Sequence, residues 1–287
     1  MSESRKNTLR FLLLMCVFGC IGPLVRAVGL PSPVTACLRA WVSSAALIVY
    51  FILTKKKFTR ADLGGSLLPM ILSGVLIATD WIGLFASYNY TTIAVATVCY
   101  YVVPILILLA SPLVLGERFT KKHLFCSLGA FAGLICISGV LTGGFRSGSL
   151  LGPAFALFGA VSYAGVILLN KKYPSGDPML RTTIQLAAAA AATTPYVLLT
   201  CDVTTLHLTL TGLAALLLLG IGLTAVTYVL YFDLVVKNPA RTVAILSYAD
   251  PAVAVIISVV FLSEPMTLFG LLGTVLIIGS AMISELV

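Results

Sequence analysis

The chain has 287 residues, of which 60% are hydrophobic and only 10% are charged, and its mean hydropathy is +1.09. Soluble globular domains carry about 25% charged residues, so this composition excludes a soluble enzyme, a disordered chain and a disulfide scaffold. The net charge of +8 does not indicate a nucleic-acid partner, because the basic residues lie in alternate loops rather than on one face.

Ten apolar segments follow one another along the chain, each long enough to cross a bilayer, which takes about 20 residues. They cover residues 9–28, 34–54, 67–87, 94–115, 123–141, 150–169, 182–199, 213–235, 242–261 and 266–283. The short segments between them carry turn and charge signals, such as the three lysines at 55–57 and the glycines at 143–144. We therefore predict an all-α membrane protein with ten transmembrane helices.

The first of these segments follows Arg5 and Lys6 and contains Arg10, a pattern that resembles the start of a signal peptide. The internal repeat described below includes this segment. We therefore expect it to be retained as the first transmembrane helix.

The distribution of basic residues predicts the orientation in the membrane. Short loops rich in Lys and Arg resist translocation and stay in the cytoplasm. With the N-terminus inside, 15 of the 18 Lys and Arg residues fall on the cytoplasmic side. Only Arg26 and Arg146 fall outside, and Arg39 lies within the second span. We expect a multi-pass protein of the cell (inner or plasma) membrane with both termini in the cytoplasm.

The chain repeats itself when it is shifted by 147 residues. Identical pairs at this shift are Tyr101 with Tyr248, Pro104 with Pro251, Glu117 with Glu264 and Thr120 with Thr267. We predict two halves, residues 1–145 and 146–287, each with five helices. Because five is odd, the second half must enter the membrane in the opposite orientation. Such inverted repeats are typical of secondary transporters, whose halves rock about a site at the membrane midplane.

The ends of both halves resemble a known family. Residues 94–139, with Pro104 within a span, Gly116-Glu117 at its end and a glycine-rich span after it, resemble the end of an EamA-like repeat. Residues 242–279 keep the proline and glutamate but have serine in place of Gly116. This resemblance to the EamA-like family of the drug/metabolite transporter (DMT) superfamily implies a transporter with a central cavity lined by both halves. Members move amino acids, sugars, nucleotide derivatives, quaternary amines or drugs.

Three ionisable residues lie within predicted spans: Arg39, Asp80 and Asp250. A charge at bilayer depth costs roughly 2.5–3.5 kcal/mol on insertion scales, so such residues usually face a cavity and mark a pathway. We interpret both aspartates as substrate ligands or proton carriers, with an Asp80–Arg39 ion pair as the structural alternative. Arg39 resembles the arginine common in the second span of EamA-like repeats, where it would bind substrate, cap helix ends or reach the outer interface.

Aromatic residues near the mid-span prolines complete the candidate site. Proline removes a backbone hydrogen bond, and the carbonyl it frees is tolerated where it is packed or lines a cavity. The predicted substrate-binding residues are Arg39, Asp80, Trp81, Tyr101, Tyr163, Tyr228, Tyr248 and Asp250. Aromatic rings with carboxylates suit an organic cation or an amino acid. We assign Tyr50, Tyr88, Tyr90 and Tyr173 to the aromatic belt at the membrane interfaces.

These patterns predict a secondary active transporter of a small organic metabolite, such as an amino acid, an amine or a related compound, that works by alternating access. The alternative is a flippase for a lipid-linked substrate, or an accessory subunit of one. The expected partners are the substrate and the lipid bilayer, with no nucleic acid; a coupling proton and a second copy of the chain remain open.

We expect no enzyme activity, catalytic residue, metal or cofactor. Glu117 and Glu264 fall on opposite membrane faces, about 30 Å apart, which is too far for a catalytic pair. We expect each glutamate to stabilise the N-terminus of the helix that follows it in the chain.

Overall fold

The computed structural model describes most of the chain. It leaves out residues 1–2, 20, 57–58, 60–61, 63–65, 119–120, 139, 143–149, 175, 254–255, 257–267 and 286–287. The described part is all-helical and contains no strand. Glu264, one of the repeated residues, lies outside the described residues.

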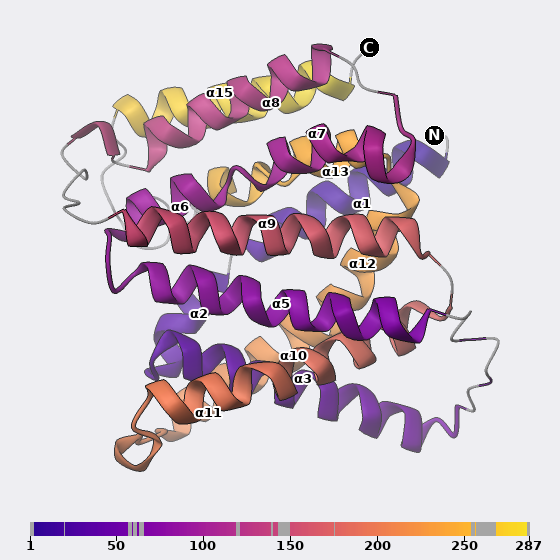
Figure 1. Ribbon diagram of the computed structural model, residues 1–287, viewed down its shortest axis with the longest axis vertical. Coiled ribbons are helices and arrows are strands. Elements are labelled where there is room, and N and C mark those ends of the chain that lie inside the picture. The colour runs from indigo at the N-terminus through magenta and orange to yellow at the C-terminus, as the bar shows by residue number, and fades with distance from the viewer. Residues whose placement is uncertain are drawn as a thin grey trace.

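The helices follow one another as Figure 1 shows. They are α1 (Glu3–Phe18), α2 (Ile21–Val28), α3 (Ser32–Leu53), α5 (Leu67–Ser87), α6 (Ile93–Tyr100), α7 (Val103–Leu115), α8 (Lys121–Ile137), α9 (Leu151–Lys172), α10 (Pro178–Thr200), α11 (Leu210–Leu217), the π-helix η3 (Leu218–Val226), α12 (Thr227–Lys237), α13 (Ala240–Leu246) and α15 (Leu268–Glu285). Short 3₁₀ turns cover Val140–Thr142 and Val203–Thr205. In the described part, six helices are long and apolar enough to cross a membrane. The chain is therefore a multi-pass membrane protein.

A turn interrupts the helix within the first, fourth and ninth predicted spans. The first is split into α1 and α2, and the fourth into α6 and α7. In the fourth span, α6 ends at Tyr100 and α7 begins at Val103, with Pro104 in its first turn. Proline has no N–H to donate and disfavours a helical conformation in the residue before it. The predicted span is present as an apolar stretch over Val95–Leu115, and a short turn before Pro104 interrupts its helix.

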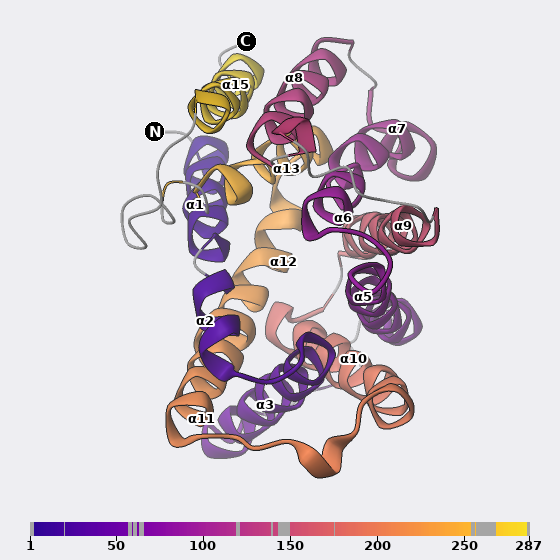
Figure 2. The ribbon, with the colours of Figure 1, turned by 90° about the vertical axis from the view of Figure 1, so that its left-hand side faces the viewer.

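Most helices run side by side along one direction (Figure 1), and α1 begins and α15 ends at the same end of the molecule. Figure 2 shows α8 and α15 together at one edge and α3, α10 and α11 toward the opposite edge. The pairing of α8 with α15 depends on glycine, because a Cβ atom on Gly133 would lie 2.6 Å from the Gly273 carbonyl oxygen. Small residues let membrane helices approach this closely.

Two further glycine contacts are related by a constant shift in sequence. A Cβ atom on Gly74 of α5 would lie 2.6 Å from Ala188 Cβ of α10. A Cβ atom on Gly220 of η3 would lie 2.6 Å from Val42 Cγ1 of α3. Gly220 follows Gly74 by 146 positions, and Ala188 follows Val42 by the same 146. The contact of α5 with α10 therefore corresponds, residue for residue, to that of η3 with α3.

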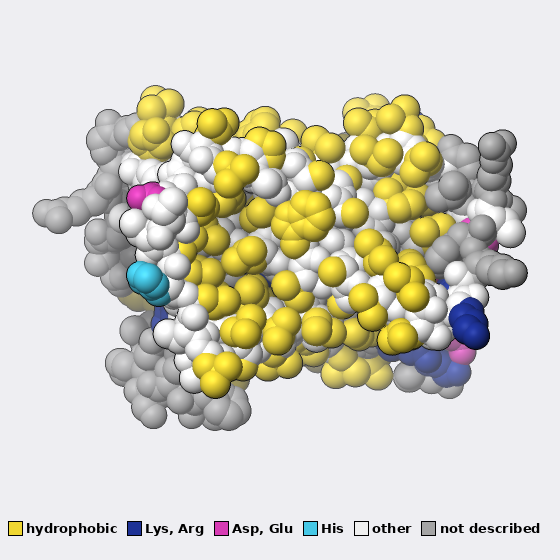
Figure 3. Space-filling model, turned by 90° about the horizontal axis from the view of Figure 1, so that it is seen from below, with side chains coloured by type: hydrophobic (Ala, Val, Ile, Leu, Met, Phe, Trp, Pro, Cys, Tyr) yellow, Lys and Arg dark blue, Asp and Glu magenta, His cyan; other side chains and the backbone are white. Residues whose placement is uncertain are grey.

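The surface in Figure 3 is hydrophobic across its middle, and the Lys and Arg side chains visible there gather at one end. We call this the basic end; it is where α1 begins and α15 ends (Figure 1). Lysines at the helix termini there are Lys55, Lys56, Lys121, Lys171 and Lys237. An apolar band between polar ends is the surface that a bilayer requires.

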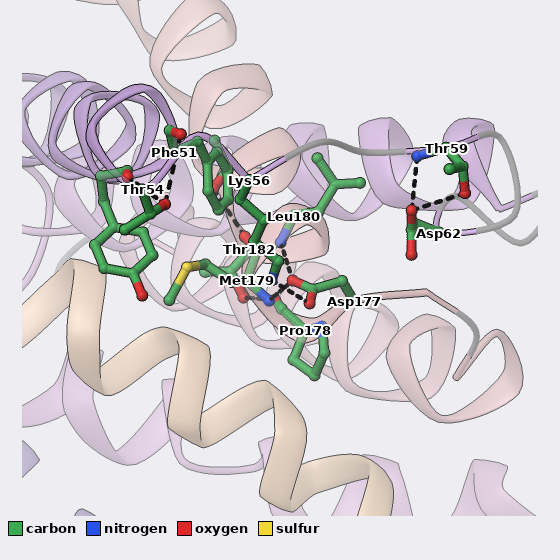
Figure 4. A network of polar contacts seen from close by, with 12 residues as sticks. Phe51, Thr54, Lys56, Thr59, Asp62, Asp177, Pro178, Met179, Leu180 and Thr182 are labelled. Carbon is green, nitrogen blue, oxygen red and sulfur yellow. Dashed lines mark hydrogen bonds and ion pairs between the residues drawn. The ribbon is translucent and has the colours of Figure 1, made fainter.

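At the basic end, an ion pair joins the loop after α3 to the start of α10 (Figure 4). Lys56 Nζ lies 2.6 Å from Asp177 Oδ2. The Asp177 carboxylate also accepts hydrogen bonds of 3.0 Å from the backbone N–H groups of Met179 and Leu180, and so caps α10. Partial burial alone would raise the pKa of Asp177, but the bond from Lys56 and those from the two N–H groups outweigh it and lower the pKa.

We predict that Asp177→Ala lowers the free energy of unfolding by about 0.5–2 kcal/mol, the usual cost of losing a helix N-cap. Because the folded pKa lies below the ordinary value of 3.8, this stabilisation is complete above that pH and is lost as the pH falls through the folded pKa. Thermal unfolding in detergent at pH 7 and near pH 3 measures both effects. If Asp177→Ala lowers the stability by the same amount at both pH values, the charge of Asp177 contributes nothing.

Candidate substrate-binding cavity

A cavity of about 630 Å³ lies between helices from the two halves of the chain. Its walls come from α1, α2, α3, α5, α6, α7 and α8 of the first half and from α9, α12 and the segment after α13 of the second. This volume falls in the range typical of small-molecule sites, roughly 300–1,000 Å³.

The cavity extends toward one end of the molecule only. Its lining reaches Arg26 near the end of α2, Tyr88 after α5 and Ser138 after α8, all at the end opposite the basic end. Toward the basic end, a layer of apolar side chains with at most 3% exposure closes the space: Phe11, Ile107, Val166, Ile167, Val235 and Leu246. Among the described residues, the cavity lining thus extends toward the end opposite the basic end, and buried apolar side chains lie between the cavity and the basic end.

Asp80 lies on α5 and lines the cavity, although only 2% of it is exposed. Its Oδ1 atom has no hydrogen-bond partner, while the Tyr100 hydroxyl interacts with the carboxylate. Glycine lets α9 approach here, since a Cβ atom on Gly159 would lie 2.9 Å from the Asp80 carbonyl oxygen. A buried carboxylate oxygen without a donor is costly, so this atom is free to accept a bond from a ligand.

Arg39 lies on α3, and its guanidinium carbon stands 4.3 Å from the centre of the Trp81 ring. Its Nε–H has no partner, and the residue is 9% exposed on the cavity wall. Among the ion pairs of the described residues, none joins Arg39 to Asp80. The alternative of an Asp80–Arg39 ion pair was therefore wrong. Stacking on the indole holds the cation in place.

Asp250 accepts a hydrogen bond from Tyr101, the residue that matches Tyr248 when the sequence is shifted by 147 positions. The Tyr101 hydroxyl donates to Asp250 Oδ2 at 2.9 Å. The Tyr248 hydroxyl in turn donates to the Tyr101 carbonyl oxygen at 3.1 Å, and the two rings stack with centroids 6.3 Å apart. That carbonyl lies at the break between α6 and α7, where proline interrupts the helical bonding. The two tyrosines therefore join the halves beside the cavity.

Tyrosine and phenylalanine rings form the rest of the inner wall. The Tyr163 and Tyr231 hydroxyls are 2.9 Å apart, and the Tyr100 and Tyr163 ring centroids are 6.3 Å apart. Phe18 of α1 packs edge-on against Tyr228 and Tyr231, at 5.8 and 5.4 Å. This wall presents several ring faces and hydroxyl groups to the space.

Seven of the eight predicted residues line the cavity: Arg39, Asp80, Trp81, Tyr101, Tyr163, Tyr228 and Asp250. Tyr248 does not line it, because its side chain is fully buried in a cluster with Ala130, Leu134 and Ile277. It acts on the site through Tyr101.

Two further tyrosines that the sequence places near the mid-span prolines or within a span, Tyr100 and Tyr231, also line the cavity. Tyr231 is three positions from Tyr228 on the same face of α12. Tyr88, assigned to the aromatic belt, lines the cavity as well. Its place at the end of α5 is typical of a belt residue, and no sequence signal separates the two environments.

Glu117 also caps a helix distant in sequence. Its carboxylate accepts hydrogen bonds of 3.0 and 3.2 Å from Ala240 N–H, at the first turn of α13. Lys171 Nζ lies 3.5 Å from Glu117 Oε1 and donates to the Asn238 carbonyl oxygen at 2.5 Å. Glu117 therefore caps α13 of the second half; the start of the next helix in the chain, residues 119–120, lies outside the described residues. This cluster of Glu117, Lys171, Asn238 and Ala240 lies at the basic end.

The helical bundle, its apolar surface and its central cavity define a membrane transporter of small molecules. The chain belongs to the EamA-like transporter family of the DMT superfamily, whose sequence pattern matches residues 6–139 and 150–285.

Individual relatives are similar over much of their length. The uncharacterized transporter YxxF of Bacillus subtilis (strain 168) is 24% identical over 280 residues, 96% of this chain and 89% of YxxF. Protein PecM of Dickeya dadantii (strain 3937) is 27% identical over 185 residues, 63% of this chain and 61% of PecM. A solved crystal structure has the same fold, with a TM-score of 0.86 and 20% identity over 99% of both chains.

Proposed function

We propose that this protein is a secondary active transporter that moves a small organic molecule carrying an ammonium group, such as an amino acid or an amine, across the cell membrane. The observation that carries the proposal is the cavity in which Asp80 and Asp250 lie among tyrosine rings between the two halves of the chain. Carboxylates pair with an ammonium group, and ring faces attract it by cation–π contact.

The shape of the cavity supports a mechanism of alternating access. The basic end faces the cytoplasm, since loops rich in Lys and Arg resist translocation. Both termini then lie in the cytoplasm, and the cavity opens outward while apolar side chains and the Glu117–Lys171 pair close the cytoplasmic side. Transport requires the opposite state, which the rocking of two inverted halves provides. The matched contacts of Gly74 with Ala188 and of Gly220 with Val42 support this division into halves.

Substrate binding is tested by thermal unfolding of the purified protein in the presence of amino acids, amines, sugars and nucleosides. A ligand at about 100 times its Kd stabilises the folded state by about 2.7 kcal/mol. We expect the stabilising compounds to carry an ammonium group and the matched compounds without one, such as the corresponding carboxylic acids, to have no effect. Stabilisation by sugars alone would contradict the assignment.

The energy source gives a separate prediction. The sequence contains no GxxxxGK[ST] motif to hold nucleotide phosphates. We predict that proteoliposomes containing only this protein transport the identified compound when an ion or substrate gradient is imposed, without ATP. An absolute requirement for added ATP would contradict secondary transport.

A further inference from the structure

A second set of buried polar side chains lies outside the cavity, between α5, α9 and α10. Ser73, Asn170 and Gln185 are each at most 2% exposed. The Gln185 amide nitrogen donates to Ser73 Oγ at 3.0 Å and to Asn170 Oδ1 at 2.9 Å, and the Asn170 amide donates to Ser73 Oγ at 3.1 Å. These three uncharged polar side chains thus form a hydrogen-bonded cluster in the half of the bundle that we propose faces the cytoplasm.

Two buried polar atoms in or next to this cluster have no hydrogen-bond partner. Gln185 Oε1 accepts no hydrogen bond. One turn earlier on the same face of α10, Arg181 is 2% exposed; it donates to the Phe232 carbonyl oxygen at 3.1 Å, and its Nε–H has no partner. A buried acceptor and a buried donor without partners are each costly. Both atoms are therefore available to a hydrogen-bonding ligand.

The cluster occupies the place that corresponds to Arg39 in the other half. Gln185 follows Arg39 by 146 positions, the same shift that relates the glycine contacts of Gly74 and Gly220. Arg39 lies on the wall of the open cavity, whereas Gln185 lies packed at the closed, cytoplasmic side. In a transporter built from inverted halves, exchanging the conformations of the halves exchanges these two environments.

We propose that Ser73, Asn170, Arg181 and Gln185 form a second substrate subsite, which lines the cytoplasmic pathway when the outer cavity closes. The inference rests on the proposed alternating access. The free Nε–H of Arg181 and the free Oε1 of Gln185 suit a ligand that offers both an acceptor and a donor, as the carboxylate and ammonium groups of an amino acid do. Asp80 and Asp250 receive the ammonium group on the outer side, and Arg181 binds the carboxylate on the inner side.

Cysteine accessibility tests this pathway without a known substrate. The background is a variant lacking the native cysteines at positions 16, 20, 37, 99, 126, 136 and 201 and shown to be folded. Ser73→Cys reports the inner subsite, and Ser247→Cys, on the cavity wall, reports the outer one. Ala130→Cys, fully buried between α8 and its neighbours, is the control for a permanently packed site. The probe is a charged, membrane-impermeant thiol reagent, applied to inside-out and right-side-out vesicles.

Glu117→Gln removes the ion pair with Lys171 that helps to close the cytoplasmic side, and Lys171→Gln is a second variant with the same purpose. We expect either change to speed the labelling of Ser73→Cys from the cytoplasmic side by about fivefold and to slow that of Ser247→Cys from the outside, because one equilibrium governs both. Ala130→Cys should remain unlabelled.

The possible failures are distinguishable. If Ser247→Cys labelling slows but Ser73→Cys stays as unreactive as Ala130→Cys, the outer site alternates and the inner subsite does not exist. If neither cysteine responds to Glu117→Gln or Lys171→Gln, the alternating access on which the inference rests is itself contradicted.

Discussion

Replacing Asp80 with asparagine is expected to abolish net transport while the protein stays folded. Asparagine keeps the size of the side chain but removes the charge that we propose pairs with a substrate ammonium group. Losing one partner of a buried charge pair costs about 2–5 kcal/mol, so transport should fall by at least about 30-fold. Uptake into proteoliposomes measures the loss, and size-exclusion chromatography in detergent checks that the variant stays monodisperse.

Asp250→Asn is the companion variant. The Tyr101 hydroxyl that donates to Asp250 Oδ2 still finds an acceptor in the asparagine side chain, so we expect this fold to survive. Asp62→Asn is the matched control, because that carboxylate is bonded to Thr59 within its own loop, far from the cavity lining. If Asp80→Asn and Asp250→Asn both transport normally, the cavity charges have no role. If transport falls only because the variants unfold, the carboxylates are structural.

Gly74→Ala is expected to destabilise the bundle. The added Cβ would lie 2.6 Å from Ala188 Cβ and close to the backbone of Gln185, and neither group is the end of a flexible side chain. Overpacking of this kind typically costs about 1–3 kcal/mol. The control is Gly279→Ala on α15, where an added Cβ meets nothing within 4 Å. Thermal unfolding in detergent should show a lower midpoint for Gly74→Ala alone.

The corresponding Gly220→Ala variant should be destabilised as well. There the added Cβ would lie 2.6 Å from Val42 Cγ1 and 2.9 Å from Val42 Cβ, and rotation about χ1 does not move that Cβ. Equal stability of Gly74→Ala and the wild type would contradict the close approach of α5 and α10.

Sequence reasoning reached the helical membrane class and most of the cavity because bilayer physics leaves few alternatives. An aspartate such as Asp80 in an apolar run is costly unless it faces a cavity, so its position alone indicates where the site lies. The same reasoning missed hydrogen bonds between residues that are distant in sequence. Nothing near Tyr248 indicates that its hydroxyl binds the Tyr101 carbonyl and leaves the cavity. Nor does Glu117 reveal that the helix it caps begins at Ala240, on the other half.

The cavity wall carries two guanidinium groups, Arg26 and Arg39, beside the two carboxyl groups of Asp80 and Asp250. With both carboxyl groups ionised, the four groups carry no net charge, so we expect the membrane potential to act chiefly on the substrate. A monovalent amine gains or loses about 2.3 kcal/mol per 100 mV, whereas a zwitterionic amino acid gains nothing. Uptake measured at a clamped diffusion potential should therefore accelerate for amines when the destination is negative and stay constant for amino acids. The response to membrane potential would therefore distinguish the two classes of substrate proposed above.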